Sequence, residues 1–534
     1  MKRLLSIAVA FALLIPAASA ATFTVNSAND VDDGSCDATH CSLREAINAA
    51  NGSSGADAIA FSIGSGAQTI VLTSLLPALT DSVTIDGTTQ PGYTASPLIE
   101  IDATGLAAGI ELNGGSQSST IRGLIVHGAS AQISVTGSLG SVAIEGNYVG
   151  TDATGNSDGG AGVLGIEVNA ATATAIVIGG SGASQANVVG GNTDNGVPEG
   201  GIALVGVTAG SLIVEGNSIG IGADGTTAVP NSAGLSIDGT TSGCVIRDNV
   251  IGGNTGMGID LITARGHAIE GNLIGVLADG SVRANGGSGI FIHDTQGFVN
   301  TIGGSTASQR NVISGNAADG INFFSSAFED SDVVIQGNYI GVGPDGTSAR
   351  GNGAYGIALS DPGDNSPWAH DNTIGGSGAG EGNVIAFNSK AGVLVDDSGS
   401  GVSIGNRIEG NSIYSNGGLG IDLAHANGGG TLSDAGVTAN DAGDIDIGLG
   451  NHGQNFPILT SATSNGSSVI INGTLSSKAS RNYRICAYGS PSADPSGYGE
   501  GESFLGCTTI LTDGSGNGTF ILTTAPPNAI DWVS

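Results

Sequence analysis

One short motif recurs through the middle of this sequence and constrains the fold more than any other feature. It reads apolar-x-Gly-Asn-x-(Ile/Val)-Gly. Four regular copies and two variants occur, at Ile144–Gly150, Val214–Gly220, Ile269–Gly275, Ile335–Gly341, Ile246–Gly252 and Ile408–Tyr414. Internal repetition is the signature of solenoids, in which each unit buries its apolar face against the next. The middle of the chain is therefore expected to form one repeat domain and not several separate globular domains.

Two other motifs repeat in the same region. One is Ile-Gly-Gly-Ser followed by an Asn-Val pair, with asparagines at Asn187, Asn311 and Asn383. The other, Gly-(Ile/Leu/Val)-x-apolar, starts at Gly165, Gly201, Gly234, Gly258, Gly289, Gly320, Gly356, Gly392 and Gly420. Its apolar residues alternate with period 2, which is typical of strands with one buried face. Glycine supplies 94 of 534 residues, and because glycine weakens helices, this composition excludes a helix-rich protein. The pattern predicts an all-β fold of stacked parallel strands, a parallel β-helix.

The spacing of the motif asparagines predicts the size of a coil. The spacing from Asn147 to Asn217 is about three times the spacing from Asn249 to Asn272. A unit of about 70 residues built from three coils of about 23 fits both spacings. Asparagine tolerates positive φ at bends, and stacked asparagine amides can bond along the stack. We therefore predict an internal ladder made of Asn147, Asn217, Asn272, Asn338 and Asn411.

The two ends of the chain differ from the repeats. Ser42 and Glu45 have the spacing of a capping box, which predicts a short helix that covers the first coil. The domains expected are a signal peptide over 1–20, an N-terminal cap over 21–60, the β-helix over 61–445 and a β-sandwich-like domain over 446–534. In the last of these, alternating runs indicate strands at Ser468–Leu475, Tyr483–Tyr488 and Thr508–Leu511, and no final strand is predicted at the chain end.

The N-terminal segment predicts export. Lys2 and Arg3 precede an apolar stretch, and Ala18-Ser19-Ala20 has the small residues of a cleavage site. Without those two cations the formal net charge changes from −33 to −35, which excludes nucleic acid as a partner. We expect a secreted or surface-associated monomer with no transmembrane segment. No metal or cofactor is predicted, and Ca²⁺ is the alternative, because the acidic chain attracts divalent cations and Asp-Gly pairs recur at Asp224, Asp279 and Asp345.

Five cysteines suit an oxidising compartment. Cys36 and Cys41 are close enough in sequence to close a small loop, and Cys486 and Cys507 flank an expected hairpin. We predict these two disulfides. Cys244 remains, in an apolar run that favours a buried, inert thiol.

The segment from Cys41 to Ile47, which reads Cys-Ser-Leu-Arg-Glu-Ala-Ile, resembles the CSLREA domain, a module of exported bacterial proteins. The repeats over most of 60–440 resemble the right-handed parallel β-helix proteins of the pectin-lyase-like superfamily. Asn455–Leu459 and Gly497–Gly501 are similar to the sandwich segment that often follows such helices. The resemblance implies a right-handed fold and export, and no agreed activity.

One region of the repeats has the composition of a binding face. Period-2 alternation places Phe291 and His293 on the outside of one strand, with Asp260 exposed on the preceding coil. The same frame exposes Asn322 and Phe324 on the next coil. Aromatic faces beside amides and carboxylates suit sugar rings, so Phe291, His293, Asn322 and Phe324 are predicted ligand-binding residues. The weaker catalytic candidates are Asp260, His293 and Asp294.

Two functions remain open from the sequence. The first is a non-catalytic β-helix that presents a long repetitive face for glycan binding or adhesion to a cell-surface component. The second is an extracellular polysaccharide-degrading enzyme with a groove around residues 258–370, and a lyase is favoured over a hydrolase. An ordered set of acids with a base would favour the enzyme, and the sequence shows only scattered pieces of such a set.

Overall fold

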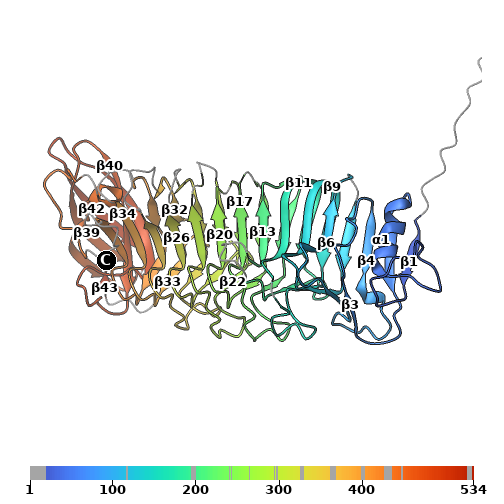
Figure 1. Ribbon diagram of the computed structural model, residues 1–534. Coiled ribbons are helices and arrows are strands. Elements are labelled where there is room, and N and C mark those ends of the chain that lie inside the picture. Colours follow the sequence, from blue (N-terminus) through green and yellow to red (C-terminus); the bar gives the residue numbers. More distant parts are fainter. Residues whose placement is uncertain are drawn as a thin grey trace, which may run out of the picture.

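The chain forms an elongated solenoid with a helix at its N-terminal end and an antiparallel domain at its C-terminal end (Figure 1). The computed structural model describes residues 20–115, 118–160, 162–193, 200–239, 241, 243–263, 265–293, 295, 299–324, 330–360, 369–397, 403–425, 436–446, 449–525 and 532–534. The predicted signal segment up to residue 19 and Asp294 lie outside these ranges.

Each coil passes through three parallel faces in a fixed order. Face 1 contains β6 (Ala108–Asn113), β9 (Ala131–Glu145), β11 (Leu164–Gly179), β13 (Ile202–Val205), β17 (Leu235–Asp238), β20 (Ile259–Ile262), β23 (Ile290–His293), β26 (Ile321–Phe324), β30 (Ile357–Ser360), β34 (Val393–Asp397) and β37 (Ile421–His425). The nine strand-entry motifs of the sequence give the nine strands or strand segments of this face from β11 to β37, paired in order and in one register.

Face 2 follows face 1 in the coil, and the long strands β9 and β11 run through the corner that joins them into one 23-stranded sheet. Its other strands are β1 (Thr22–Val25), β2 (Asp57–Phe61), β4 (Val83–Asp86), β7 (Ser119–Arg122), β15 (Leu212–Glu215), β18 (Cys244–Arg247), β21 (Ala268–Glu270), β24 (Thr301–Gly303), β28 (Val334–Gln336), β32 (Thr373–Gly375) and β35 (Arg407–Glu409). Short pairs at this corner are β14 (Thr208–Ala209) on β11, and β27 (Asp330–Ser331) with β31 (Ala369–His370).

Face 3 is a 12-stranded parallel sheet. It contains β3 (Gln68–Val71), β5 (Ile99–Asp102), β8 (Leu124–His127), β10 (Tyr148–Val149), β12 (Val188–Val189), β16 (Ser218–Ile219), β19 (Val250–Ile251), β22 (Leu273–Ile274), β25 (Val312–Ile313), β29 (Tyr339–Ile340), β33 (Val384–Ala386) and β36 (Ser412–Tyr414). Three parallel faces wound in this order are a parallel β-helix, so the predicted right-handed β-helix class is confirmed.

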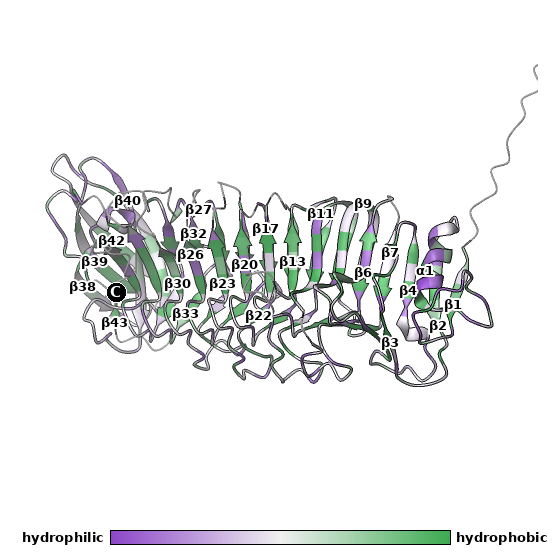
Figure 2. Cartoon of the chain, in the orientation of Figure 1, coloured by the Kyte–Doolittle hydropathy of each residue, from purple (hydrophilic) through white to green (hydrophobic). Residues whose placement is uncertain are grey.

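Alternating apolar residues of all three faces fill the interior. Figure 2 shows apolar positions recurring along the strands of the solenoid. Ile259, Ile290 and Ile321 occupy equivalent inward positions on consecutive coils, and each is 0% exposed. Each side chain contributes about 1.5–3 kcal/mol by leaving water, and β-branched residues fit the pleated strands. The core is therefore one continuous column along the solenoid.

Two asparagine ladders run along the corners on either side of face 3. The first comprises Asn147, Asn187, Asn217, Asn249, Asn272, Asn311, Asn338, Asn383 and Asn411, and each side-chain NH₂ donates to the Oδ1 atom of the next. It includes the five predicted residues. The second comprises Asn192, Asn231, Asn254, Asn285, Asn316, Asn352, Asn388 and Asn416. The second ladder was not predicted from the sequence.

The first ladder shows that the predicted coil size was wrong. Asn187 lies between Asn147 and Asn217 in the ladder, so the span between them holds two coils and not three. The coil from Asn249 to Asn272 is 23 residues long, whereas its neighbours are longer because hairpins and loops extend from their corners. The second asparagine motif, with Asn187, Asn311 and Asn383, lies in the same ladder as the first, which the spacing of the first motif alone does not reveal.

Four hairpins within the described ranges, which we call the arms, project from the corner between faces 3 and 1. Their antiparallel bridges are Thr151–Asp158, Ile221–Ala228, Val276–Val282 and Val342–Ala349. Each arm bonds to the one before it: the backbone N–H of Asp224 donates to Asn156 Oδ1 at 2.9 Å, Arg283 Nε donates to the Thr226 carbonyl at 2.6 Å, and Arg350 Nε donates to the Gly280 carbonyl. The arms occur on every second coil and form a continuous row.

The Asp-Gly pairs are the turns of three of these arms, as the sequence favoured. Asp224 Oδ1 accepts the backbone N–H groups of Thr226 and Thr227, and Gly225 has a φ of +71°. The Thr227 hydroxyl and these N–H groups lower the pKa of Asp224 to about 2. Its oxygens are therefore occupied by turn hydrogen bonds.

The N-terminal end of the solenoid is covered by α1 (Leu43–Gly52), which connects β1 to β2. The predicted capping box is present: the Ser42 hydroxyl accepts the Glu45 N–H, and the Glu45 carboxylate accepts the Ser42 N–H at 2.8 Å. Leu43, Ala46, Ile47 and Ala50 are buried in the main core. The first coil begins at β1, inside the range predicted for the cap, and the 3₁₀ turn η1 (Gly87–Thr89) lies further along the solenoid.

Beyond the solenoid, two three-stranded antiparallel sheets enclose a separate small core that includes Ile471, Ile485 and Phe520. One sheet is β38 (Ile458–Ser464), β39 (Val469–Ser476) and β42 (Asn517–Thr524); the other is β41 (Ser503–Leu511), β40 (Asn482–Ser490) and β43 (Trp532–Val533).

The prediction of no final strand was wrong, because Trp532 and Val533 pair with β40. The 3₁₀ segment η2 (Gly450–Gly453) packs on β34 and β37, so residues predicted for the C-terminal domain still belong to the end of the solenoid.

The C-terminal domain caps the last coil through polar contacts. Glu500 Oε1 accepts the backbone N–H of Asn416 at 3.1 Å and its side-chain NH₂ at 3.2 Å, so a carboxylate terminates the second asparagine ladder. The Tyr488 hydroxyl accepts the Gly410 N–H at 2.9 Å, and Arg484 pairs with Glu409 at 2.7 Å. These contacts give hydrogen-bond and ion-pair partners to polar groups of the last coil, at an end of the β-helix that would otherwise be open.

The disulfides Cys36–Cys41 and Cys486–Cys507 are both present, and Cys244 is a buried free thiol. Burial raises the pKa of Cys244 well above its usual range, as expected for an inert thiol. No helix among the described residues is long and apolar enough to cross a membrane.

Candidate functional site

The predicted binding residues lie on the outer surface of face 1, on β20, β23 and β26. The register pairs Asp260 with Phe291 and Phe291 with Asn322, so these three side chains form one outward row. Ile262 pairs with His293, and Phe324 follows in the next outward position. The inward neighbours, such as Ile292 and Phe323, are fully buried. Period-2 alternation therefore gave the correct side of the strand for every residue of the patch.

Aromatic rings form the centre of this patch. The rings of Phe291 and Phe324 are stacked, with centroids 5.9 Å apart and an interplanar angle of 28°. The His293 ring lies 5.3 Å from that of Phe291. Phe324 is 38% exposed, whereas most aromatic side chains of the solenoid are more deeply buried. The three rings therefore make a continuous aromatic surface across two adjacent coils.

His293 also pairs with Asp260 across the strands. Its Nε2 atom lies 3.2 Å from Asp260 Oδ1. The Asp260 side chain is only 4% exposed, and that of His293 is 19% exposed. The prediction that Asp260 is exposed was wrong, because Asp260 points outward but is covered by its neighbours in the patch. The carboxylate can orient the imidazole, but a polymer on the surface does not reach it directly.

A row of polar contacts that was not predicted continues from Asn322. Its NH₂ donates to Asp319 Oδ2 at 2.6 Å, and Asp319 Oδ1 accepts the Tyr355 N–H at 2.9 Å. The Lys390 ammonium lies 4.6 Å from the centre of the Tyr355 ring. Burial raises the pKa of Asp319, although these donors and the Lys390 charge oppose the shift.

The sequence contains a pattern that could have predicted these polar contacts. Asp319 and Tyr355 each stand directly before a strand-entry glycine, Gly320 and Gly356. Because these glycines stack coil on coil, the residues before them form a column beside the patch. Reading that column along with the strands would have found both residues.

The other aromatic residues of this region have different roles. Phe323 is fully buried, and Tyr355 is 1% exposed. Tyr339 lies under the Arg310 guanidinium, 4.2 Å from its ring centre. Phe298, Phe328, Trp368 and the catalytic candidate Asp294 lie outside the described residues.

Two clefts lie at other places on the molecule. One of about 770 Å³ lies on the C-terminal domain, lined by residues of β39, β41 and β42 that include Thr474, Ile510 and Thr519. A smaller one of about 100 Å³ lies between two arms, beside Asp279, Asp345 and Arg350. No residue of the patch lines either cleft. The patch is a face with one exposed ring, which suits contact with a surface or an extended chain.

Comparisons with known proteins leave the family open. No family model matches the chain, and no curated protein matches it, so the CSLREA resemblance stays a prediction. Among solved structures, the chain is similar to the A-module of mannuronan C-5 epimerase AlgE4 from Azotobacter vinelandii, with 16% identity over 73% of this chain and 88% of that one and a TM-score of 0.37. It is also similar to a GH136 lacto-N-biosidase from Eubacterium ramulus, with 11% identity over 75% and 68% of the two chains and a TM-score of 0.21. Both similarities are distant, and neither identifies a ligand for this chain.

Proposed function

We propose that this protein is a secreted or surface-associated β-helix that binds extracellular glycans through the outer patch of Phe291, His293, Asn322 and Phe324. The observation that carries the proposal is the stacked pair Phe291–Phe324, 5.9 Å apart on adjacent coils and next to polar groups. A sugar ring presents C–H groups on its face and hydroxyls at its rim. Aromatic faces pack against the C–H groups, and the Asn322 amide and the His293 ring can form hydrogen bonds with the hydroxyls.

The geometry of the patch favours binding over chemistry. The two rings come from neighbouring strands of a rigid sheet, so they are held in place before a ligand arrives and little side-chain entropy is lost on binding. The net charge of −33 opposes acidic polymers, so neutral glycans are the expected class unless a cation bridges an acidic one. The two disulfides suit an oxidising, extracellular compartment.

The test is binding of the full chain to a panel of neutral and acidic polysaccharides, with and without Ca²⁺. The variant Phe324→Ala should weaken binding to any positive glycan at least tenfold, because stacking on an aromatic ring is lost. The matched control is Phe504→Ala, which removes a phenylalanine of equal exposure (37% against 38%) from the C-terminal domain. Equal affinity of the two variants, or no binding to any glycan, would contradict the proposal.

The pair Asp260–His293 supports one alternative, a polysaccharide lyase or hydrolase. A buried carboxylate that orients a histidine is the arrangement of a general base. New reducing ends, or the absorbance of unsaturated uronates, in the same panel would establish this alternative. Their loss in His293→Ala would assign the base.

A further inference from the structure

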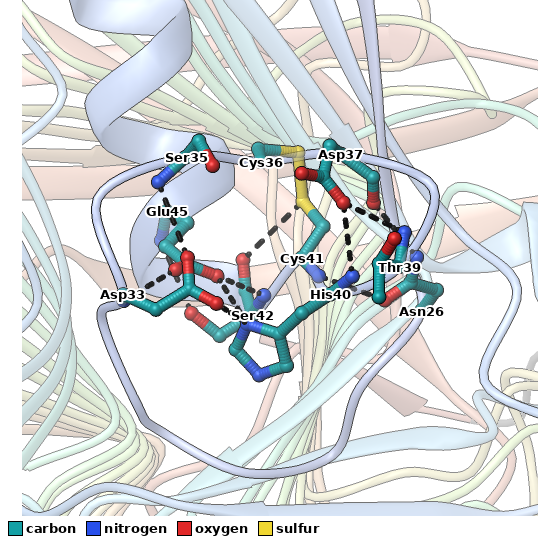
Figure 3. The surroundings of a disulfide bond; sticks show 10 residues. All are labelled: Asn26, Asp33, Ser35, Cys36, Asp37, Thr39, His40, Cys41, Ser42 and Glu45. Carbon is teal, nitrogen blue, oxygen red and sulfur yellow. Dashed lines mark hydrogen bonds and ion pairs between the residues drawn. A yellow bond between two sulfur atoms is a disulfide. The ribbon is translucent and has the colours of Figure 1, made fainter.

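Three side chains of the N-terminal cap converge at a place unrelated to the patch. His40 Nδ1 lies 3.0 Å from Glu45 Oε2 and 3.4 Å from Asp33 Oδ2, and the ligand atoms of the three residues all lie within 4.8 Å of one another (Figure 3). His40 lies in the loop closed by the Cys36–Cys41 disulfide, Asp33 precedes that loop, and Glu45 is in the first turn of α1. The cluster therefore joins the loop to the helix.

A hydrogen bond beside the cluster identifies the His40 nitrogen that carries a hydrogen when the ring is neutral. The backbone N–H of Val31 donates to Asn29 Oδ1 at 3.1 Å, which identifies that atom as the amide oxygen. His40 Nε2 lies 3.0 Å from the same oxygen, so Nε2 carries a hydrogen and donates it. In the neutral ring Nδ1 then has a free lone pair, and it is this atom that faces the two carboxylates.

With a neutral ring, three acceptors face one another with no donor among them. Both Glu45 oxygens already accept backbone N–H groups, from Asp33 at 2.7 Å and from Ser42 at 2.8 Å, and the Glu45 side chain is 1% exposed. Within the described part of the chain, the buried His40 Nδ1 atom has no hydrogen-bond partner besides these two carboxylates. A nitrogen lone pair at 3.0–3.4 Å from two carboxylate oxygens is repelled by them unless a proton or a metal ion lies between.

The separations fit a small divalent ion. Ligand atoms about 2.0–2.2 Å from a tetrahedral Zn²⁺ lie about 3.3–3.6 Å apart, close to the distances at Nδ1. Zinc takes imidazole and carboxylate ligands, and a ligating histidine almost always donates its other ring N–H to an oxygen, as His40 does to Asn29. The Asp33 side chain is 52% exposed, which leaves an open side for entry of the ion and for water as a fourth ligand.

We propose that Asp33, His40 and Glu45 form a metal site for a divalent transition-metal ion of the zinc type. Such an ion would cross-link the disulfide loop to the first turn of α1 and so fix the cap on the first coil. These metal ligands could not be predicted from the sequence, because the spacing of the three residues matches no zinc motif and the site depends on the fold of the loop.

The test uses the untagged mature chain, stripped with a chelator and titrated with Zn²⁺ by calorimetry. We expect one saturable site. His40→Ala should weaken its affinity at least 100-fold, and Asp33→Asn, which keeps the shape of an exposed side chain, at least tenfold. Zn²⁺ should also raise the thermal midpoint of the unmodified chain and have little effect on that of His40→Ala. Glu45 is left unchanged because the helix cap depends on it.

The matched control is His370→Ala, since His370 Nδ1 also lies beside a carboxylate, 2.9 Å from Asp371 Oδ2. This variant should bind Zn²⁺ like the unmodified chain. The proposal is overturned if the chain binds no zinc, in which case a proton on His40 occupies the cluster. Binding that His40→Ala and Asp33→Asn leave unchanged would assign the metal to acidic groups elsewhere. Ca²⁺ binding of equal strength at this site would overturn the assignment to a zinc-type ion.

Discussion

The side-chain NH₂ of Asn249 donates to Asn272 Oδ1 at 3.0 Å, and the same oxygen accepts the Asn249 backbone N–H at 3.0 Å. These two residues are 23 positions apart and lie one above the other on consecutive coils. Asn272 in turn donates to Asn311 and to the Ile246 carbonyl. Each ladder asparagine thus satisfies backbone groups at a corner where no strand can, because the chain bends there.

Asn272→Ala should therefore reduce the free energy of unfolding by about 3 kcal/mol, since it leaves several buried donors and acceptors without partners. Denaturant unfolding followed by circular dichroism measures the change. Asn169→Ala is the control, because Asn169 is exposed and its side chain bonds to nearby Glu167, and its effect should be below about 0.5 kcal/mol. Equal effects of the two variants would mean that the ladder adds little to stability.

His267 should make stability depend on pH. It is 1% exposed, its Nδ1 accepts the Cys244 N–H at 3.2 Å, and burial lowers its pKa from 6.5 to about 4. The unfolded chain takes up the proton first, so this contribution is complete above pH 6.5 and is lost as the pH falls to about 4. The loss amounts to about 3 kcal/mol.

His267→Asn should flatten that dependence. Asn300 occupies the corresponding position on the next coil, so asparagine fits there. Thermal unfolding of both proteins between pH 4 and 7 gives the comparison. A slope that persists in the variant would assign the acid sensitivity to other groups.

Glu500→Ala should loosen the C-terminal domain from the solenoid. The change removes the carboxylate that accepts both N–H groups of Asn416 at the end of the second ladder. We expect limited proteolysis to release the C-terminal domain at least threefold faster, because local opening becomes more frequent. Glu502→Ala is the control, since no side-chain bond of Glu502 to the last coil is seen among the described contacts. Equal rates would show that Glu500 does not hold the junction.

Removal of one arm should leave the fold intact. An arm separates Asn272 from Asn285 of the two ladders, whereas on the preceding coil the short strand β19 alone separates Asn249 from Asn254. Deletion of residues 276–283 shortens the spacing from Asn272 to Asn285 until it equals the spacing from Asn249 to Asn254. The product should keep its circular dichroism spectrum and melt at a lower temperature, because buried Val276 is lost. Deletion of 266–273, of equal length, removes β21 and Asn272 and should prevent folding.

Strand positions and their buried faces could be predicted because period-2 alternation is a local pattern. The nine strand-entry glycines lie where this pattern puts them, and so do the outward side chains of Phe291, His293, Asn322 and Phe324. The number of coils could not be obtained by dividing one motif spacing, because coil length varies with the arms. The burial of Asp260 and the contacts of Asp319 and His40 depend on residues from other coils or other parts of a loop, which no local pattern encodes.

The alternation of arms gives the molecule two different periods. Adjacent parallel strands are about 4.8 Å apart, so the interior ladders repeat at that interval, and the arms, on every second coil, recur at about 9.6 Å. A linear partner lying along this edge could touch all four arms in the same way only if its own repeat were close to about 9.6 Å or a simple fraction of it. The spacing of the arms therefore sets a geometric condition on any partner that contacts several of them, and this condition comes from the backbone and not from individual side chains.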